Sequence, residues 1–213
     1  MTQTHEDTRR ESVEVIWHGH SCFEIRCGLD SVVIDPFLEV PGYGQLELSA
    51  DLVLVSHEHD DHNAKERVAL TGRKSAIQVQ VIESFHDKEE GRLRGPNRIH
   101  LVSLCGLRLA HLGDLGHPLE EATLDLLGDL DVLLIPVGGH YTIDSEEAAV
   151  IVKALSPRLT VPMHYREAAA GWQVTSGVEP FLRHFDRVRF SDRSSFFPDE
   201  EKGGVLVLRN PMI

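Results

Sequence analysis

The sequence predicts an α+β fold in which two β-sheets pack face to face with helices outside them. Two observations carry this prediction. Short apolar and β-branched runs dominate the first half of the chain, and in the second half such runs alternate with helical patterns. A chain of 213 residues, 41% of them hydrophobic, can also form one sizeable core. This order favours two sheets over one doubly wound sheet.

The expected strands are short, apolar and bounded by turn residues. They cover residues 13–17, 22–26, 31–34, 52–55, 77–82, 99–104, 107–110, 132–135, 159–161, 188–190 and 204–208. Helices are expected over residues 64–70, 119–127, 145–155 and 178–184. The helix over 145–155 has clear end signals, because Asp144 or Ser145 can cap it and Ser156-Pro157 ends it.

Length and charge favour one domain that acts on a small molecule. We expect a single domain over residues 12–213, after a disordered lead-in over residues 1–11 that lacks the apolar segment of a secretory signal. The apolar runs are far shorter than the ~20 residues of a membrane helix. The formal charge of -13 disfavours nucleic acid as a partner. The expected partner is therefore a small-molecule substrate, with neither nucleic acid nor a membrane.

The three cysteines are Cys22, Cys27 and Cys105. They are too few and too irregularly spaced for a disulfide framework or a Cys-x-x-Cys metal site. We therefore expect a reducing, cytoplasmic location. Cys22 lies in an apolar strand, which predicts an inert thiol.

Metal-binding residue types follow the strand expected over residues 52–55. Residues 56–62 read Ser-His-Glu-His-Asp-Asp-His. In an extended segment alternate side chains face one side, so His57 and His59 point together, whereas Asp61 and His62 follow where the chain turns. Imidazole and carboxylate are the groups by which catalytic zinc is held, and manganese or iron can occupy similar sites. A solvated acidic turn that holds three histidines by chance is the alternative.

The pattern H-x-H-x-D-H, formed by His57, His59, Asp61 and His62, resembles the signature of the metallo-β-lactamase superfamily. Other motifs resemble the remaining elements of that superfamily in the same order: Phe85-His86-Asp87, Gly113-Asp114 and Pro162-Met163-His164-Tyr165. Gly19-His20-Ser21, Asp35-Pro36 and His111-Leu112-Gly113-Asp114 are most similar to its small Zn-dependent hydrolases, relatives of the ascorbate-phosphate lactonase-like proteins. The resemblance spans residues 17–165. It implies a four-layer αββα sandwich, the metallo-β-lactamase fold, with metals at the edge between the sheets.

The resemblance also implies two metal ions per chain, with Zn2+ expected and Mn2+ or Fe2+ as alternatives. The first ion would be held by His57, His59 and His86, the second by Asp61, His62 and His164, and Asp114 would bridge them. His111 competes with His86 as the third histidine of the first site. Because His111 lies three residues before Asp114, the two would face opposite sides of one strand, and we favour His86.

The activity implied is that of a metal-dependent hydrolase. A hydroxide bridging the two metal ions would cleave a small ester, lactone or phosphodiester, and Asp61 would be both ligand and catalytic proton acceptor. A nuclease or phosphodiesterase of the same fold is the nearest rival. A redox di-iron protein usually has Glu at the position of His59, and a non-catalytic metal-binding protein is expected to have lost ligands.

Several polar residues near the motifs keep two interpretations. His20 is expected as a buried hydrogen-bonding residue rather than a ligand. Asp35 either orients a liganding imidazole or belongs to a turn. Five loop residues either shape the pocket or are ordinary loop structure: Arg94, Asn97, His140, Tyr141 and Trp172.

Overall fold

Two β-sheets supply most of the regular structure in the computed structural model, which describes residues 12–212. The five-stranded sheet contains β1 (Val13–Gly19), β2 (Cys22–Cys27), β3 (Asp30–Ile34), β5 (Leu52–Leu54) and β13 (Ser195–Phe196). The seven-stranded sheet contains β7 (Gln78–Phe85), β8 (Pro96–Leu104), β9 (Leu107–His111), β10 (Val132–Pro136), β11 (Leu159–Met163), β12 (Val188–Phe190) and β14 (Gly204–Val207). The lead-in expected over residues 1–11 lies outside the described residues.

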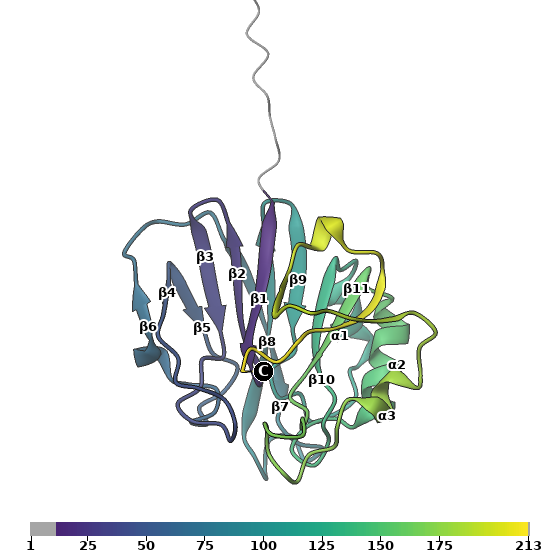
Figure 1. Cartoon of the computed structure of the whole chain (residues 1–213). Helices are drawn as coiled ribbons and strands as arrows, with labels where there is room; N and C mark the ends of the chain where they lie inside the picture. Colours follow the sequence, from purple (N-terminus) through teal and green to yellow (C-terminus); the bar gives the residue numbers. More distant parts are fainter. Residues whose placement is uncertain (1–11, 213) are drawn as a thin grey trace, which may run out of the picture.

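The two sheets face each other across the main core (Figure 1). Their strand orders are β13-β1-β2-β3-β5 and β12-β14-β11-β10-β9-β8-β7. Burial alternates along β1, where Val13, Val15 and Trp17 point into the core. Every residue of β10 and β11 is buried, because helices cover the outer face of that sheet. The predicted sandwich of two sheets is confirmed.

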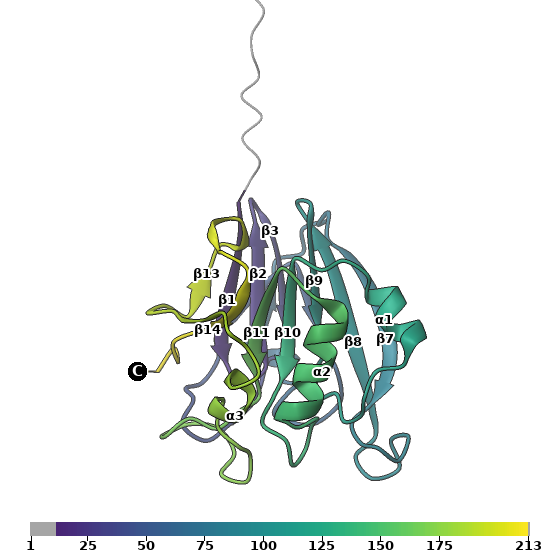
Figure 2. The same ribbon diagram turned by 90° about the vertical axis from the view of Figure 1, so that its right-hand side faces the viewer.

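The α-helices pack on the outer face of the seven-stranded sheet (Figure 2). They are α1 (Glu121–Leu127), α2 (Ser145–Leu155) and α3 (Glu179–Leu182). The bounds of α2 were predicted correctly, and Asp144 caps it by accepting hydrogen bonds from the backbone N–H groups of Glu146 and Glu147. Among residues 12–212, no helix combines the length and apolarity needed to cross a membrane.

The helix expected over residues 64–70 was wrong. This segment forms a 3-10 turn, η1 (Lys65–Arg67), and then β6 (Val68–Leu70), which pairs with β4 (Leu48–Ala50). The pairing buries Val68 in a second apolar cluster outside the five-stranded sheet. Seven residues are too few for apolar periodicity to distinguish a helix from a turn and strand. The short β4, β13 and η2 (Pro198–Glu200) were also missed.

A disulfide joins Cys27, at the end of β2, to Cys105, in the turn between β8 and β9. From the cysteine pattern we expected no disulfide, and this expectation was wrong. The two residues are 78 positions apart, and only the packing of the two sheets brings them together. Cys22 is free and buried, and burial raises the pKa of its thiol. The cytoplasmic location stays a prediction.

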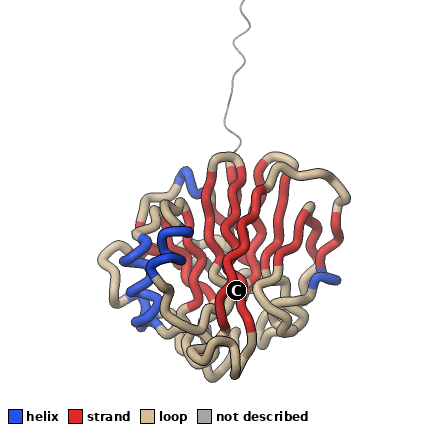
Figure 3. The backbone as a smooth tube through the Cα atoms, turned by 180° about the vertical axis from the view of Figure 1, so that it is seen from behind, coloured by secondary structure: helices blue, strands red, loops and turns tan. Residues whose placement is uncertain are grey.

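The strands that lead to the predicted motifs end at one edge of the sandwich. β1, β3 and β5 run in one direction within their sheet. β7, β9, β10 and β11 likewise share a direction in the other sheet. The loops that follow these strands gather at the lower edge of the molecule in Figure 3. This edge carries the histidines and aspartates singled out from the sequence.

Candidate metal centre

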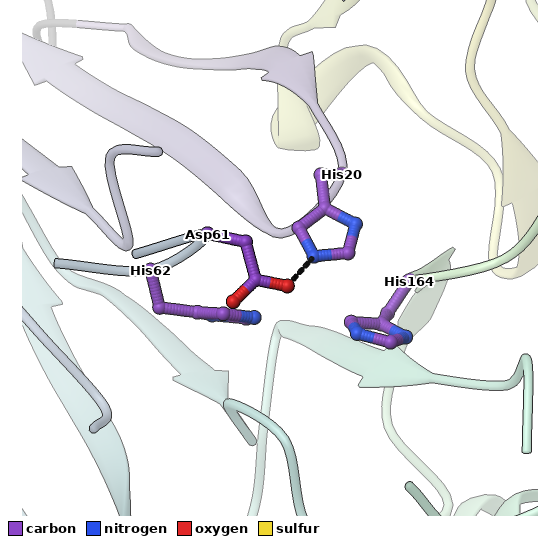
Figure 4. Close-up of side chains that lie close together, drawn as sticks. All are labelled: His20, Asp61, His62 and His164. Atoms are coloured by element: carbon purple, nitrogen blue, oxygen red, sulfur yellow. Dashed lines mark ion pairs between the residues drawn. The ribbon is translucent and has the colours of Figure 1, made fainter. Parts of the chain in front are cut away.

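The loops after β5, β7, β9 and β11 bring all seven predicted metal ligands together. Their ligand atoms form three overlapping groups, in each of which all atoms lie within 4.8 Å of one another. The groups are His57, His59 and His86; His57, His62 and Asp114; and His20, Asp61, His62 and His164. We call the seven predicted residues the ligand cluster. His20 joins them from the turn between β1 and β2, as Figure 4 shows.

Asp114 lies at the centre of the ligand cluster and is 2% exposed. Its carboxylate oxygens lie 3.2 Å from Nε2 of His62, 3.2 Å from Nε2 of His164 and 3.3 Å from Nε2 of His86. Nε2 of His57 is 4.0 Å away. Burial alone would raise the pKa of Asp114, but the imidazoles of His164 and His62 outweigh it and hold that pKa well below its usual range. The carboxylate is therefore an anion that requires cationic partners.

The backbone before Asp114 needs a glycine and a buried amide. Gly113 has a φ of 57°, and a Cβ there would meet Oδ1 of Asn97 at 2.4 Å and Cβ of Ser56 at 2.5 Å. Asn97 accepts a hydrogen bond from the N–H of Asp114 at 2.9 Å and donates one to the carbonyl of Leu112 at 3.0 Å. Asn97 is thus a buried residue of β8 that holds the Asp114 loop, and its expected position in a loop was wrong.

Asp35 orients two histidines of the ligand cluster from behind. Its fully buried carboxylate accepts hydrogen bonds from the Ser56 N–H at 2.7 Å and the Ser56 hydroxyl at 2.6 Å, and it lies 2.9 Å from Nδ1 of His62. Ser56 Oγ is also 2.9 Å from Nδ1 of His57. Because an ionised carboxylate only accepts, Nδ1 of His62 donates to Asp35, and Nδ1 of His57 donates to Ser56 Oγ, whose own hydrogen goes to Asp35. In the neutral form of each imidazole the lone pair is therefore on Nε2, the atom that faces Asp114.

His111 is occupied by structural hydrogen bonds. Its Nε2 lies 2.8 Å from the carbonyl oxygen of Ser21, and its Nδ1 accepts from the N–H of Gly113 at 3.1 Å. Both ring nitrogens are therefore committed away from the ligand cluster. The structure places His86, not His111, beside His57 and His59. Ligation by His86 stays a prediction.

His20, expected from the sequence as a buried hydrogen-bonding residue rather than a ligand, is buried beside the ligand cluster. It is 2% exposed and has a φ of 52°, after Gly19, where a Cβ would collide with the ring of Tyr43 at 2.3 Å. Trp17 fixes the turn by donating a hydrogen bond from Nε1 to the His20 carbonyl at 3.0 Å. Nε2 of His20 lies 3.4 Å from Oδ2 of Asp61 and, within the described part of the chain, has no hydrogen-bond partner. The Gly19-His20-Ser21 turn was the available signal.

The donor set fits metal ions. Within residues 12–212, three buried ring nitrogens at this edge have no hydrogen-bond partner: Nε2 of His20, Nε2 of His57 and Nδ1 of His164. Each such atom costs about 1–3 kcal/mol if nothing binds it. Burial, aided by the nearby His62, lowers the pKa of His57 to about 3, so this imidazole is neutral and can offer a lone pair. Neutral imidazoles and carboxylates are the ligands of catalytic zinc sites.

A cavity of about 240 Å³ opens onto the ligand cluster. Its walls are formed by His59, Asp61, His86, Arg94, Asp114, Tyr141, His164 and Trp172. Arg94, Tyr141 and Trp172 therefore line this cavity, which agrees with the interpretation that they shape the pocket. His140 is exposed and does not line this cavity. Trp172 donates a hydrogen bond from Nε1 to Oδ2 of Asp61 at 3.0 Å.

Known proteins share both the sequence pattern and the fold. Residues 14–164 match a β-lactamase superfamily domain. A metal-dependent hydrolase of Thermoplasma acidophilum is 30% identical over 190 residues, which cover 73% of this chain and 84% of that protein. A metal-dependent hydrolase of Thermococcus kodakarensis is 32% identical over 190 residues, covering 72% and 84%.

A crystal structure from Thermotoga maritima, described as a Zn-dependent hydrolase of the metallo-β-lactamase superfamily, is also similar. It has a TM-score of 0.74 and 29% identity, covering 92% of this chain and 98% of that chain. Fold, site and relatives together define an enzyme of the metal-dependent hydrolase class. The chain belongs to the β-lactamase superfamily. The closer relation to ascorbate-phosphate lactonase-like proteins stays a prediction.

Buried neutral histidines predict that the metal-free protein loses stability in mild acid. Burial lowers the pKa of His20 and of His100 to about 4 and that of His57 to about 3, from 6.5. Between pH 6.5 and about 4 the unfolded chain therefore binds more protons, and the free energy of unfolding falls as pH falls. The raised pKa of His62 does not offset this, because its stabilisation is already complete below pH 6.5.

Urea unfolding of chelator-treated protein at pH 6.5 and pH 5 measures this effect. We expect a lower free energy of unfolding at pH 5, and a smaller difference in His100→Gln, which removes one of these groups outside the ligand cluster. An unfolding free energy that is equal or greater at pH 5 would contradict the burial of these imidazoles in neutral form.

Proposed function

We propose that the enzyme hydrolyses a small ester, lactone or phosphodiester at a centre of two metal ions. The observation that carries this proposal is the convergence of four imidazole nitrogens on the buried Asp114 carboxylate within 4.0 Å. A protein interior tolerates so many polar atoms close together when a bound ligand or ion provides their missing partners.

The groups of ligand atoms suggest how the ions are divided. His57, His59 and His86 would hold the first, Asp61, His62 and His164 the second, and Asp114 would reach both. Zn2+ is the proposed metal, and Mn2+ or Fe2+ can be held by the same nitrogen and oxygen donors. When bound, two such ions supply Lewis acidity and a water molecule acidic enough to ionise at neutral pH.

Asp61 is the proposed catalytic residue because it belongs both to the ligand cluster and to the cavity wall. Burial alone would raise the pKa of its carboxyl group, but contacts with His20 and His62 outweigh it and lower that pKa. Asp61 is therefore ionised at neutral pH. As an anion with the Trp172 indole holding Oδ2, it can orient the attacking water and accept its proton.

The cavity suggests a small substrate. Its volume of about 240 Å³ lies below the ~300–1,000 Å³ of most drug-sized ligand pockets. The net charge of -13 also disfavours a long polyanion such as RNA or DNA. We therefore propose a small molecule and not a polynucleotide as the substrate.

Substitution of Asp61 tests the assignment of the catalytic residue. Asp61→Asn keeps nearly the same volume but removes the charge and the proton acceptor. We expect turnover to fall by ~100-fold or more, the scale of losing an acid–base group. The measurement is kcat of the metal-loaded variant on a substrate chosen from a panel of esters, lactones and phosphodiesters.

Asp60→Asn is the matched control for this substitution. Asp60 is the exposed neighbour of Asp61, lies outside the ligand cluster and loses the same charge. We expect this control to keep kcat within about twofold of wild type, a change far smaller than the ~10²-fold loss expected when an acid–base group is removed. If Asp61→Asn retains its metals and turns over at the wild-type rate, Asp61 has no part in the chemistry.

We further propose that His20 is an additional ligand of the second metal ion, since its Nε2 faces Oδ2 of Asp61 (Figure 4). Asn tolerates a positive φ, but its side chain is too short to reach the second metal ion. His20→Asn should therefore weaken binding of that ion by about 10–100-fold. Competition with a chelator measures this for each ion.

His140→Asn is the control for the turn geometry, because His140 also has a positive φ of 61° but is exposed and lies outside the site. Wild-type affinity for both ions in His20→Asn would show that His20 serves only the turn.

A further inference from the structure

We infer that the substrate carries an anionic group, a carboxylate or a phosphate, which Arg94 binds at the wall of the metal cavity. The inference rests on the proposed function for the reaction that follows binding. Arg94 is the single Arg or Lys side chain among the eight residues that line the cavity, whose other ionisable members are three histidines, Tyr141, Asp61 and Asp114. The two aspartates belong to the ligand cluster, so Arg94 is the charge left to meet the substrate.

The Arg94 guanidinium has no carboxylate partner within residues 12–212. The guanidinium lies over the face of the Tyr141 ring, 4.5 Å from Cζ to the ring centroid. Stacking on an aromatic face leaves the N–H groups at the edge of the guanidinium available to a ligand. In a chain with 34 acidic residues, an arginine kept free of them at the mouth of a cavity suggests a function other than a surface ion pair.

The neighbouring arginines are paired in the ordinary way. Arg92, two residues earlier in the same loop, is exposed and lies 3.0 Å from the carboxylate of Glu89. Arg98, at the start of β8, lies within 4.0 Å of the carboxylates of Glu58 and Glu83. Arg94 therefore differs from both in its surroundings.

The loop that carries Arg94 is built around one carboxylate. Asp87 accepts hydrogen bonds from the backbone N–H groups of four loop residues, at 2.7 Å from Glu89, 3.0 Å from Gly91, 3.0 Å from Leu93 and 2.7 Å from Arg94. The His86 N–H donates to the Gly95 carbonyl at 3.1 Å and closes the loop at its base. The residue after a predicted metal ligand thus fixes the backbone of Arg94, which gives the guanidinium a defined position over the cavity.

A guanidinium selects ligands by geometry as well as charge. Its planar donors pair with two oxygens of a carboxylate or phosphate at once, and such charge-assisted bonds are about twice as strong as neutral ones. The cavity of about 240 Å³ limits the distance between this group and the bond to be cleaved. The substrate is therefore a short molecule with an oxyanion at one end and the scissile bond at the other.

Direct binding to the zinc-loaded enzyme tests the inference without requiring turnover. The probes are butanoate, with one anionic end, and succinate, glutarate and 3-phosphonopropanoate, with two. Isothermal titration gives the Kd of each for wild type and for Arg94→Gln. In wild type, at least one doubly anionic probe should bind about tenfold or more tightly than butanoate, and this ratio should fall close to one in Arg94→Gln. Comparison of the carboxylates with the phosphonate identifies the preferred oxyanion.

Arg92→Gln removes the same charge from the same loop outside the cavity, so it should retain the wild-type ratio. Arg94→Lys keeps the charge without the planar donors, and an intermediate ratio is expected. An unchanged ratio in Arg94→Gln, or no preference for a second anion in wild type, overturns the inference. Failure of the metal-loaded wild type to hydrolyse any ester, lactone or phosphodiester would instead count against the proposed function, whatever the binding ratios.

Discussion

The buried carboxylate of Asp114 is the constraint on which the rest of this edge depends. An anion that is 2% exposed needs cationic or donating partners on every side, and the protein supplies imidazoles from β5, β7 and β11 loops. His62 lies between two carboxylates, with Nδ1 2.9 Å from Asp35 and Nε2 3.2 Å from Asp114. Without metal ions, protonated histidine has to balance this charge. In the proposed two-metal centre the same imidazoles would be neutral ligands.

Three of the seven non-glycine residues with a positive φ among residues 12–212 lie in or behind the ligand cluster. His20, Asp35 and His164 all have φ between 50° and 52°, a region that residues with a side chain rarely adopt. Each lies directly after a strand or its turn, and each places a side chain in or behind the ligand cluster. Strain of about 1–3 kcal/mol per residue persists only where surrounding packing fixes the backbone. The two packed sheets supply that packing, so the core holds the backbone of these three residues in a less favourable conformation.

The sequence predicted the parts of the structure whose cause is local. Strand positions followed from apolar runs, and α2 followed from its cap and its terminating Ser156-Pro157. The seven residues of the ligand cluster were found because a motif places them at strand ends, where parallel strands bring them together. The helix expected over residues 64–70 was wrong because the second half of this segment, β6, pairs with the distant strand β4.

Contacts between distant segments were hidden from the sequence. His20 comes within 3.4 Å of Asp61 only because the β1–β2 turn from one sheet meets the loop after β5. Asn97 stood in an apparent loop but is a buried strand residue that holds Asp114. The pairing of Cys27 with Cys105 and the unpaired state of Arg94 likewise depend on which segments the fold brings together.

Metal content is the most direct measure of whether this edge is a two-metal centre. Elemental analysis of the purified chain, before and after incubation with zinc or manganese and removal of excess metal, gives the number of ions per chain. The donor set around Asp114 predicts a value close to two after reconstitution. A folded protein that binds no ion under these conditions would contradict the account, because the charge of Asp114 would then be balanced by protonated histidine alone.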